Sequence, residues 1–315
     1  MPKTPPKQSP TGLLDHVLVK NWLDNVLSPA TRTSRRDDLL SFIKYFKIKS
    51  IDDFKKFSRA DIIDWRDSLI GTQNKPKYAI RTVKRRMSTI SKFFEYLCDN
   101  KVLEINVVLG VQRPKLETTE GATQSIADHQ AKALLDAPDP KTLKGKRDRA
   151  ILATFLYHAL RRSELCKLRI KDLQEREGIK QFKIFGKGSK ERYVPAHQVA
   201  LARITEYLTA AGHGHDKEAF LFKSISNNMA KRADKGLAPN SVYELVIAYG
   251  LKVGIQAGRF STHSLRATAA TNALNNREDI RKVQHWLGHA NVSTTAMYDK
   301  RENRPEDSPT YRVRY

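Results

Sequence analysis

Four residues in one stretch of the chain have types and spacings that could bind an anion and supply a nucleophile: His263, Arg266, His289 and Tyr298. The first two form an H-x-x-R pattern, His289 closes the sequence W-L-G-H, and Tyr298 follows nine residues later. Each residue alone says little, because the chain holds eleven Tyr and nine His. The combination at fixed spacing points to a site.

Helix signals surround the H-x-x-R pattern. Ser261 or Thr262 can cap a helix that continues through an alanine-rich run to Leu274. His263 and Arg266 then lie on one face of its first turn. A helix start that presents these two side chains is suited to bind an anion.

A second helix is predicted to end at Gly288, so that His289 emerges just past a helix end, where a loop can aim it. A third, short helix is expected to be capped by Asn291 or Ser293 and to carry Tyr298 in its second turn. These elements would bring both histidines, the arginine and the tyrosine into one region of the chain.

The stretch 262–298 resembles box II of the tyrosine recombinases, the phage integrase family, in which H-x-x-R and L-G-H precede a nucleophilic tyrosine. In H-A-L-R-R-S-E-L the family's first catalytic arginine matches Arg161, and its acidic partner matches Glu164. The family usually has Gly where Ala159 stands, and we expect Ala159 to fit with a φ below zero. Another departure is Ala267, at a position that is often His in the family.

Residues 181–195 predict a β-hairpin with a G-K-G-S turn. A lysine in such a turn is usually only solvated. The family, however, carries its catalytic lysine on this hairpin, so the resemblance assigns that role to Lys187, with Lys190 as the nearby alternative. No P-loop pattern is present, so nucleotide hydrolysis has no support. The resemblance thereby gives six catalytic residues in order: Arg161, Lys187, His263, Arg266, His289 and Tyr298.

The composition favours a nucleic-acid partner. The chain of 315 residues holds 57 Lys and Arg against 34 Asp and Glu, a net charge of +23, which indicates a polyanion. We find neither a signal peptide nor an apolar run long enough to span a membrane. Cys98 and Cys166 do not have the spacing of a metal-binding or redox-active cysteine pair, and two such cysteines are consistent with a reducing cytosol. We therefore expect a cytoplasmic, nucleoid-associated protein with DNA as partner and no membrane, metal or cofactor.

Apolar residues at helical spacing predict a mainly α chain with one small β-hairpin or sheet. The resemblance implies a two-domain, C-shaped DNA clamp, made of a SAM-like helical core-binding domain and a tyrosine-recombinase catalytic domain. The expected parts are a flexible leader (1–14), the core-binding domain (15–112), a polar linker (113–124), the catalytic domain (125–300) and a tail that could contact another protomer (301–315). The family often has Asn-Pro before the linker, where this chain has Asn106-Val107.

The predicted helix over 78–97 carries five basic residues on its polar side: Arg81, Lys84, Arg85, Arg86 and Lys92. A solvated helix face is the plain alternative. The total charge and the motifs downstream favour contacts of these residues with DNA phosphates.

The resemblance implies cleavage of DNA by Tyr298 without a metal, through a 3′-phosphotyrosyl link that leaves a free 5′-hydroxyl. Religation then needs no ATP. Two rounds of exchange pass through a Holliday junction on inverted-repeat core sites, which requires a homotetramer, or a heterotetramer with a related recombinase. Such a site-specific recombinase would serve DNA integration and excision or replicon resolution.

Each residue of the site receives a role from the same resemblance. Arg161 and Arg266 would hold the non-bridging oxygens and stabilise the transition state. Lys187 would protonate the leaving 5′ oxygen, and Glu164 would orient its neighbours. His263 and His289 would hydrogen-bond the phosphate and assist proton transfer.

Other functions remain open from the sequence. A type IB topoisomerase or a hairpin telomere resolvase shares the phosphotyrosine chemistry, although the compact helical first domain favours a recombinase. A non-catalytic DNA-binding regulator is disfavoured because all six site positions are filled.

Residues 310–315 alternate as a strand that could add to a sheet edge of the same or another protomer. A frayed tail is the alternative, and the target DNA sequence is not readable.

Overall fold

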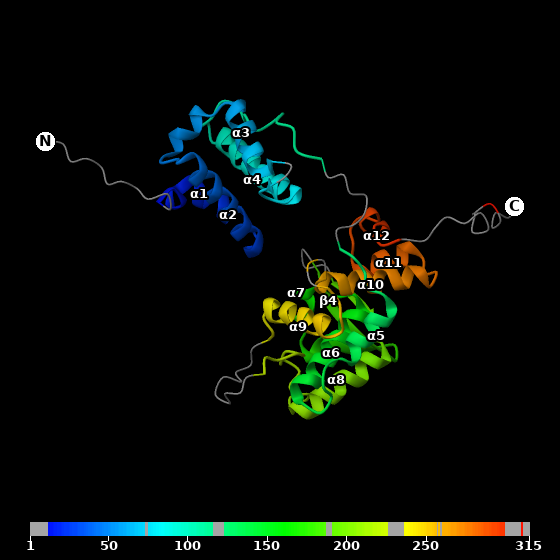
Figure 1. The fold of residues 1–315 in the computed structure, drawn as a ribbon. Helices are drawn as coiled ribbons and strands as arrows, with labels where there is room; N and C mark the ends of the chain where they lie inside the picture. Colours follow the sequence, from blue (N-terminus) through cyan, green and yellow to red (C-terminus); the bar gives the residue numbers. More distant parts are fainter. Residues whose placement is uncertain are drawn as a thin grey trace. The chain divides into compact units, whose positions relative to one another are not determined.

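The computed structural model forms two compact units, Met1–Glu117 and Thr118–Tyr315, drawn from blue to cyan and from green to red in Figure 1. The residues it describes are 12–72, 75–115, 123–186, 191–225, 236–256, 258, 260–299 and 310. Within these ranges no helix is long and apolar enough to cross a membrane. Most of the predicted leader, linker and tail falls outside them.

The first unit is helical. Its elements are the 3-10 turns η1 (Gly12–Asp15) and η2 (Ile51–Lys56), the helices α1 (Val17–Asp24), α2 (Pro29–Phe46), α3 (Arg59–Ile70) and α4 (Ile80–Asp99), and the short strands β1 (Gly71–Thr72) and β2 (Lys75–Pro76). From the sequence, Ser58 as a cap and Gly71 as a stop predict a helix between them, and these two residues bound α3. The Ser58 hydroxyl accepts a hydrogen bond from the backbone of Asp61, and Gly71 ends the helix with a φ of 76°.

Aromatic rings fill the core of this unit. The Phe42 ring lies 4.9 Å from the Trp65 ring, edge to face at 88°, and 6.1 Å from the Phe94 ring at 87°. All three side chains are fully buried. Edge-to-face pairs of this kind add to the stabilisation that apolar burial already provides, and they fix α2, α3 and α4 against one another.

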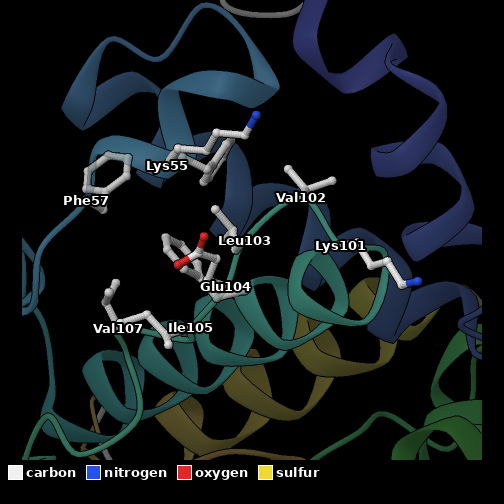
Figure 2. Close-up of a pocket in the computed structure, with 10 residues that line it drawn as sticks. Lys55, Phe57, Lys101, Val102, Leu103, Glu104, Ile105 and Val107 are labelled. Carbon is white, nitrogen blue, oxygen red and sulfur yellow. The ribbon is translucent and has the colours of Figure 1, made fainter.

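A cavity of about 610 Å³ opens between η2 and the segment that follows α4. Figure 2 shows the Glu104 side chain beside Leu103, among the residues that line the cavity. Past the cavity the chain is held tightly to α4, because the Asn106 side chain donates to the carbonyl of Ser91 at 2.9 Å. The asparagine that precedes the expected linker therefore anchors this segment without a following proline.

The second unit surrounds a buried helix. Its elements are α5 (Asp128–Asp136), α6 (Leu143–His158), α7 (Arg162–Leu165), η3 (Ile170–Asp172), β3 (Leu173–Arg176), β4 (Ile179–Phe185), β5 (Glu191–Pro195), α8 (Gln198–Ala211), α9 (Pro239–Lys252), α10 (Thr262–Asn275), α11 (Ile280–Leu287) and α12 (Ser293–Ala296). Residues 150–155 of α6 are all buried, as in a helix covered on every side. Its neighbours are α8, α10 and α5 (Figure 1).

The predicted hairpin is present as β4 and β5, and β3 extends it to an antiparallel sheet of order β3-β4-β5. Phe182 pairs with Val194 and Ile184 pairs with Arg192 across the hairpin. His158 connects α6 to the segment after this sheet. Its Nδ1–H donates to the carbonyl of Thr154 at 3.1 Å, and its Nε2 accepts from the backbone N–H of His197 at 2.9 Å.

Two local expectations are wrong. Ala159 has a φ of 51°, in the left-handed region, because it ends α6 with its N–H bonded to the carbonyl of Phe155. Tyr298 lies beyond α12 and not within it. The backbone N–H of Tyr298 bonds only three residues back, to Thr295 at 2.9 Å, so the helix ends in a tight turn. The predicted strand over 310–315 lies outside the described residues, except Thr310.

Candidate active site

The H-x-x-R pattern occupies the first turn of α10. Ser261 caps the helix, and its hydroxyl accepts from the backbone N–H of His263 at 3.2 Å. His263 is exposed, whereas Arg266 is fully buried. Partial burial lowers the pKa of His263, and the charges of Arg266 and Arg161 lower it further. The His263 imidazole is therefore biased toward its neutral form.

The Arg266 guanidinium joins three segments of the second unit. It donates to the carbonyls of Ala159 and Leu287, and its Nη2 lies 3.0 Å from Nε2 of His289. Burial and then the charge of Arg161 lower its pKa to about 10, which leaves it cationic at neutral pH. Its buried Nε has no hydrogen-bond partner in the described part of the chain. An unsatisfied buried donor costs about 1–3 kcal/mol, so this N–H lacks the acceptor that its burial calls for.

His289 follows the end of α11 and is held through both ring nitrogens. Because Nε2 faces the Arg266 donor, the ring proton belongs on Nδ1, which lies 3.0 Å from the Thr295 hydroxyl. Thr295 is fully buried. Burial lowers the pKa of His289 to about 4, with further contributions from Arg266 and Arg161. The imidazole is therefore neutral at pH 7 and has a fixed tautomer.

Tyr298 lies beside this histidine. The two ring centroids are 6.2 Å apart, and only 7% of the tyrosine surface is exposed. The Thr271 hydroxyl donates to the Tyr298 carbonyl at 3.2 Å, which fixes the backbone. Burial raises the pKa of the phenol, and the charges of Arg266 and Arg161 oppose that rise. The two arginines therefore act on the acidity of the tyrosine.

Arg161 and Glu164 form an ion pair at the start of α7. The Glu164 carboxylate accepts from the Arg161 backbone N–H and from its Nη1, both at 2.8 Å. Burial alone would raise the pKa of Glu164, but hydrogen bonds from Arg192 and Arg161 outweigh it and the pKa lies below its ordinary value. The carboxylate is therefore ionised at neutral pH.

Arg192 is a member of this cluster that the sequence analysis missed. It comes from β5, and its Nη1 and Nη2 donate to the two oxygens of Glu164 at 3.0 and 2.8 Å. The strand register contains a signal that could have found it. Arg192 lies opposite Ile184 and on the same face as Val194, both buried. An arginine on the buried face of a hairpin requires a buried partner.

Three arginines from distant segments hold three consecutive carbonyls at the end of α11. Arg192 donates to Trp286, Arg266 to Leu287, and Arg161 to Gly288. The last carbonyls of a helix lack partners within the helix and carry its negative dipole end. The end of α11 therefore gathers the positive charge of the site.

The structure thus brings together Arg161, Glu164, Arg266, His289 and Tyr298, and places His263 one turn from Arg266. Lys187 and its alternative Lys190 lie outside the described residues. In the sequence, β4 ends at Phe185 before these lysines and β5 begins at Glu191 after them, and β5 carries Arg192.

The basic residues of α4 belong to the first unit and divide into two groups. Arg85 is bound to the buried Asp38 at 2.5 Å, and Arg86 stacks on Tyr78 and lies 3.8 Å from Asp38. Arg81 and Lys92 are exposed, while Lys84 is partly buried. The predicted basic face therefore contains two residues that also hold the helices of their own unit together.

Comparisons with known proteins identify both parts of the chain. The model of the phage integrase family matches residues 124–304, and that of the phage integrase N-terminal SAM-like domain matches residues 21–101. Tyrosine recombinase XerC of Pelotomaculum thermopropionicum is 31% identical, covering 90% of this chain and 92% of that protein. Tyrosine recombinase XerD of Shewanella oneidensis is 29% identical, covering 91% of each.

Solved structures share the fold. The XerH site-specific recombinase bound to its difH substrate gives a TM-score of 0.71 at 19% identity, covering 92% of this chain and 80% of that one. A lambda integrase fragment bound as a dimer to a core site gives 0.66 at 15% identity, covering 92% and 99%. With a family model over most of the second unit and relatives matched along nearly the whole length, this chain belongs to the phage integrase family and is a Xer-like tyrosine site-specific recombinase, which cleaves and rejoins DNA.

Proposed function

We propose that Tyr298 is the nucleophile of this recombinase and that the arginine cluster at the end of α11 binds the scissile phosphate. One observation supports this most strongly. The Nε of Arg266 is buried without a described partner, in the cluster that contains His289 and Tyr298. A phosphate oxygen would supply the missing acceptor, and the guanidinium would stabilise the charge that develops on it.

Strand cleavage follows from these positions. The phenolate oxygen of Tyr298 attacks the phosphorus, the bond to the 5′ oxygen breaks, and a 3′-phosphotyrosyl ester forms. The departing 5′ oxygen takes up a proton, which we assign to Lys187, with Lys190 as the alternative. Attack by another 5′-hydroxyl reverses these steps and joins a new strand without ATP. Two such rounds proceed through a Holliday junction.

His289 and His263 are proposed to serve as neutral groups. The Nε2 of His289 already accepts from Arg266, so His289 would orient that guanidinium toward the phosphate. His263, at the exposed end of the same turn, would hydrogen-bond a phosphate oxygen or accept the proton of Tyr298. Arg161 would hold a second phosphate oxygen, with Glu164 orienting it.

We further propose that residues 15–112 and 125–300 are the core-binding and catalytic domains, joined by a linker over 113–124. Arg81 and Lys92 of α4 would contact DNA phosphates, with Lys84, Arg85 and Arg86 alongside. Four protomers, identical or from two related recombinases, would assemble on paired inverted-repeat sites. Residues 308–315 would contribute to that assembly, and their deletion should then reduce the tetramer formed on synapsed DNA, measured by light scattering.

Covalent trapping tests the proposal. Labelled duplexes from the DNA flanking the chain's own gene are nicked near candidate inverted repeats, incubated with the protein and run on denaturing gels. We expect an adduct with the wild-type chain and none with Tyr298→Phe. Specific binding without an adduct would instead favour a regulator. An adduct without joining of two different duplexes would favour a topoisomerase.

A further inference from the structure

We propose that Arg192 is a positioning residue of the cleavage site. It neutralises the buried Glu164 carboxylate, and so leaves the positive charge of Arg161 available to the scissile phosphate. The inference rests on the proposed function of the arginine cluster and assigns a role to a residue outside the six catalytic positions.

All three guanidinium nitrogens of Arg192 donate to protein acceptors. Its Nη1 and Nη2 donate to the two oxygens of Glu164, and its Nε donates to the carbonyl of Trp286 at 3.2 Å. Only 14% of its side chain is exposed. Every nitrogen of the guanidinium is therefore directed to the protein, so Arg192 acts through its neighbours.

The charge balance shows what these contacts do. The side chain of Glu164 is 4% exposed, and an uncompensated carboxylate at such a position is strongly unfavourable. If Arg161 alone faced Glu164, each charge would cancel the other. Since Arg192 binds both carboxylate oxygens, Arg161 needs to give only its Nη1 and backbone N–H. The cluster then keeps two positive charges in excess, on Arg161 and Arg266, where it would keep one without Arg192.

Arg192 also fixes where Arg161 lies. Both arginines bind the end of α11, at Trp286 and Gly288, and both bind Glu164. A Cβ added at Gly288 would lie 3.2 Å from the Arg192 side chain. The end of α11 therefore packs directly against Arg192. A planar guanidinium with three donor nitrogens can satisfy these acceptors together, whereas a lysine presents a single ammonium.

The test compares adduct formation on the duplex where the Tyr298 adduct forms. Arg192→Met should slow the adduct by about 10- to 100-fold, the usual effect of removing a group that orients a site residue. The rate of Arg192→Lys should lie between those of the wild-type chain and Arg192→Met, because lysine keeps the positive charge but lacks the planar guanidinium. The matched control is Arg176→Met, which removes an arginine stacked on Tyr193 at 4.2 Å in the same sheet and should keep the wild-type rate.

A double substitution separates charge balance from simple loss of structure. If Arg192 acts by neutralising Glu164, Glu164→Gln combined with Arg192→Met should be at least several-fold faster than Arg192→Met alone. A methylphosphonate at the scissile position, which lacks the phosphate charge, should likewise reduce the defect of Arg192→Met. Thermal melting and gel shifts confirm that each variant folds and binds DNA.

The outcomes are distinct. A wild-type rate for Arg192→Met would overturn the proposal, as would a double variant no faster than the single one. In either case the wild-type adduct would still stand, and with it the proposed function. If the wild-type chain formed no adduct on any duplex, the proposed function would fail and the role of Arg192 would fail with it.

Discussion

At the scale of single residues, Tyr298 and the two histidines differ from the same side chains in water. An ordinary tyrosine has a pKa near 10, so its ionisation at neutral pH costs about 4 kcal/mol. Burial raises the pKa of Tyr298 further, and Arg266 and Arg161 oppose that rise. Removing either arginine should therefore slow attack as well as phosphate binding.

The pH dependence of cleavage follows from the two lowered histidine values. Since the pKa of His289 is about 4, this imidazole stays neutral as the pH falls from 8 through 6.5, and the lowered pKa of His263 favours its neutral form as well. The rate of adduct formation should therefore show no change near pH 6.5 that depends on His289. In this pH range the profiles of the wild-type chain and of His289→Asn should have the same shape. A change of that kind in single-turnover rates would contradict the neutral assignment of His289.

Thr295 should fix the orientation of the His289 ring. Thr295→Val keeps the shape but removes the oxygen that accepts from Nδ1 at 3.0 Å, and we expect an adduct rate lower by about 10-fold. Nitrogen NMR of the labelled ring should still show the Nδ1–H form, because Arg266 faces Nε2, with the Nδ1 signal shifted by the loss of its acceptor. Thr295→Ser, which retains the hydroxyl, is the matched control and should behave as wild type. Equal rates for valine and serine would exclude this role.

At the scale of elements, the end of α6 connects packing to the site. His158 fixes the helix to the segment before α8, and the next residue, Ala159, offers its carbonyl to Arg266. A left-handed alanine costs roughly 1 kcal/mol relative to glycine. The position tolerates it because the Ala159 methyl is buried among α10 side chains and because its N–H closes the helix.

His158 should make the second unit sensitive to acid. Burial lowers its pKa from 6.5 to about 4, so it is neutral when folded and charged when unfolded between these values. Stability is full above pH 6.5 and is lost as pH falls toward 4. Urea unfolding should show about 2 kcal/mol less stability from this group at pH 5 than at pH 8. His158→Gln should remove this loss of stability between pH 8 and pH 5. The control is His285→Gln, at an exposed histidine, which should not remove it.

The elements also show what the sequence could predict. Capping and stop residues predicted the limits of α3 and the end of α11, because a serine or a glycine acts on its own backbone. The first turn of α10 was predicted for the same reason. By contrast, β3 has the sequence L-Q-E-R, without apolar alternation, and exists because it pairs with β4. The place of the half-buried Arg192 likewise depends on a partner more than twenty residues away.

At the scale of the whole molecule, the net charge of +23 governs DNA binding. Each phosphate contact releases counterions, so affinity should fall steeply with salt. Arg81→Met and Lys92→Met should each reduce the slope of log K against log salt by about 0.9. The control is Lys56→Met, since Lys56 is paired with Asp53 at 2.7 Å. Unchanged slopes for the Arg81 and Lys92 variants in filter-binding titrations would show that these two residues do not contact DNA phosphates.

The hydrogen bonds from three arginines to the end of α11 have a consequence for the protein during its synthesis. Arg161 and its partner Gly288 are 127 positions apart, and the carbonyls that hold all three guanidinium groups belong to α11. A nascent chain that has emerged only as far as α10 has none of these acceptors. Of the partners described above, Arg161 and Arg192 then have only Glu164, and Arg266 only the Ala159 carbonyl, and Tyr298 has not yet left the ribosome. Under the proposed function such a partial chain would not cleave DNA, because α11 and the segment that carries Tyr298 complete the site.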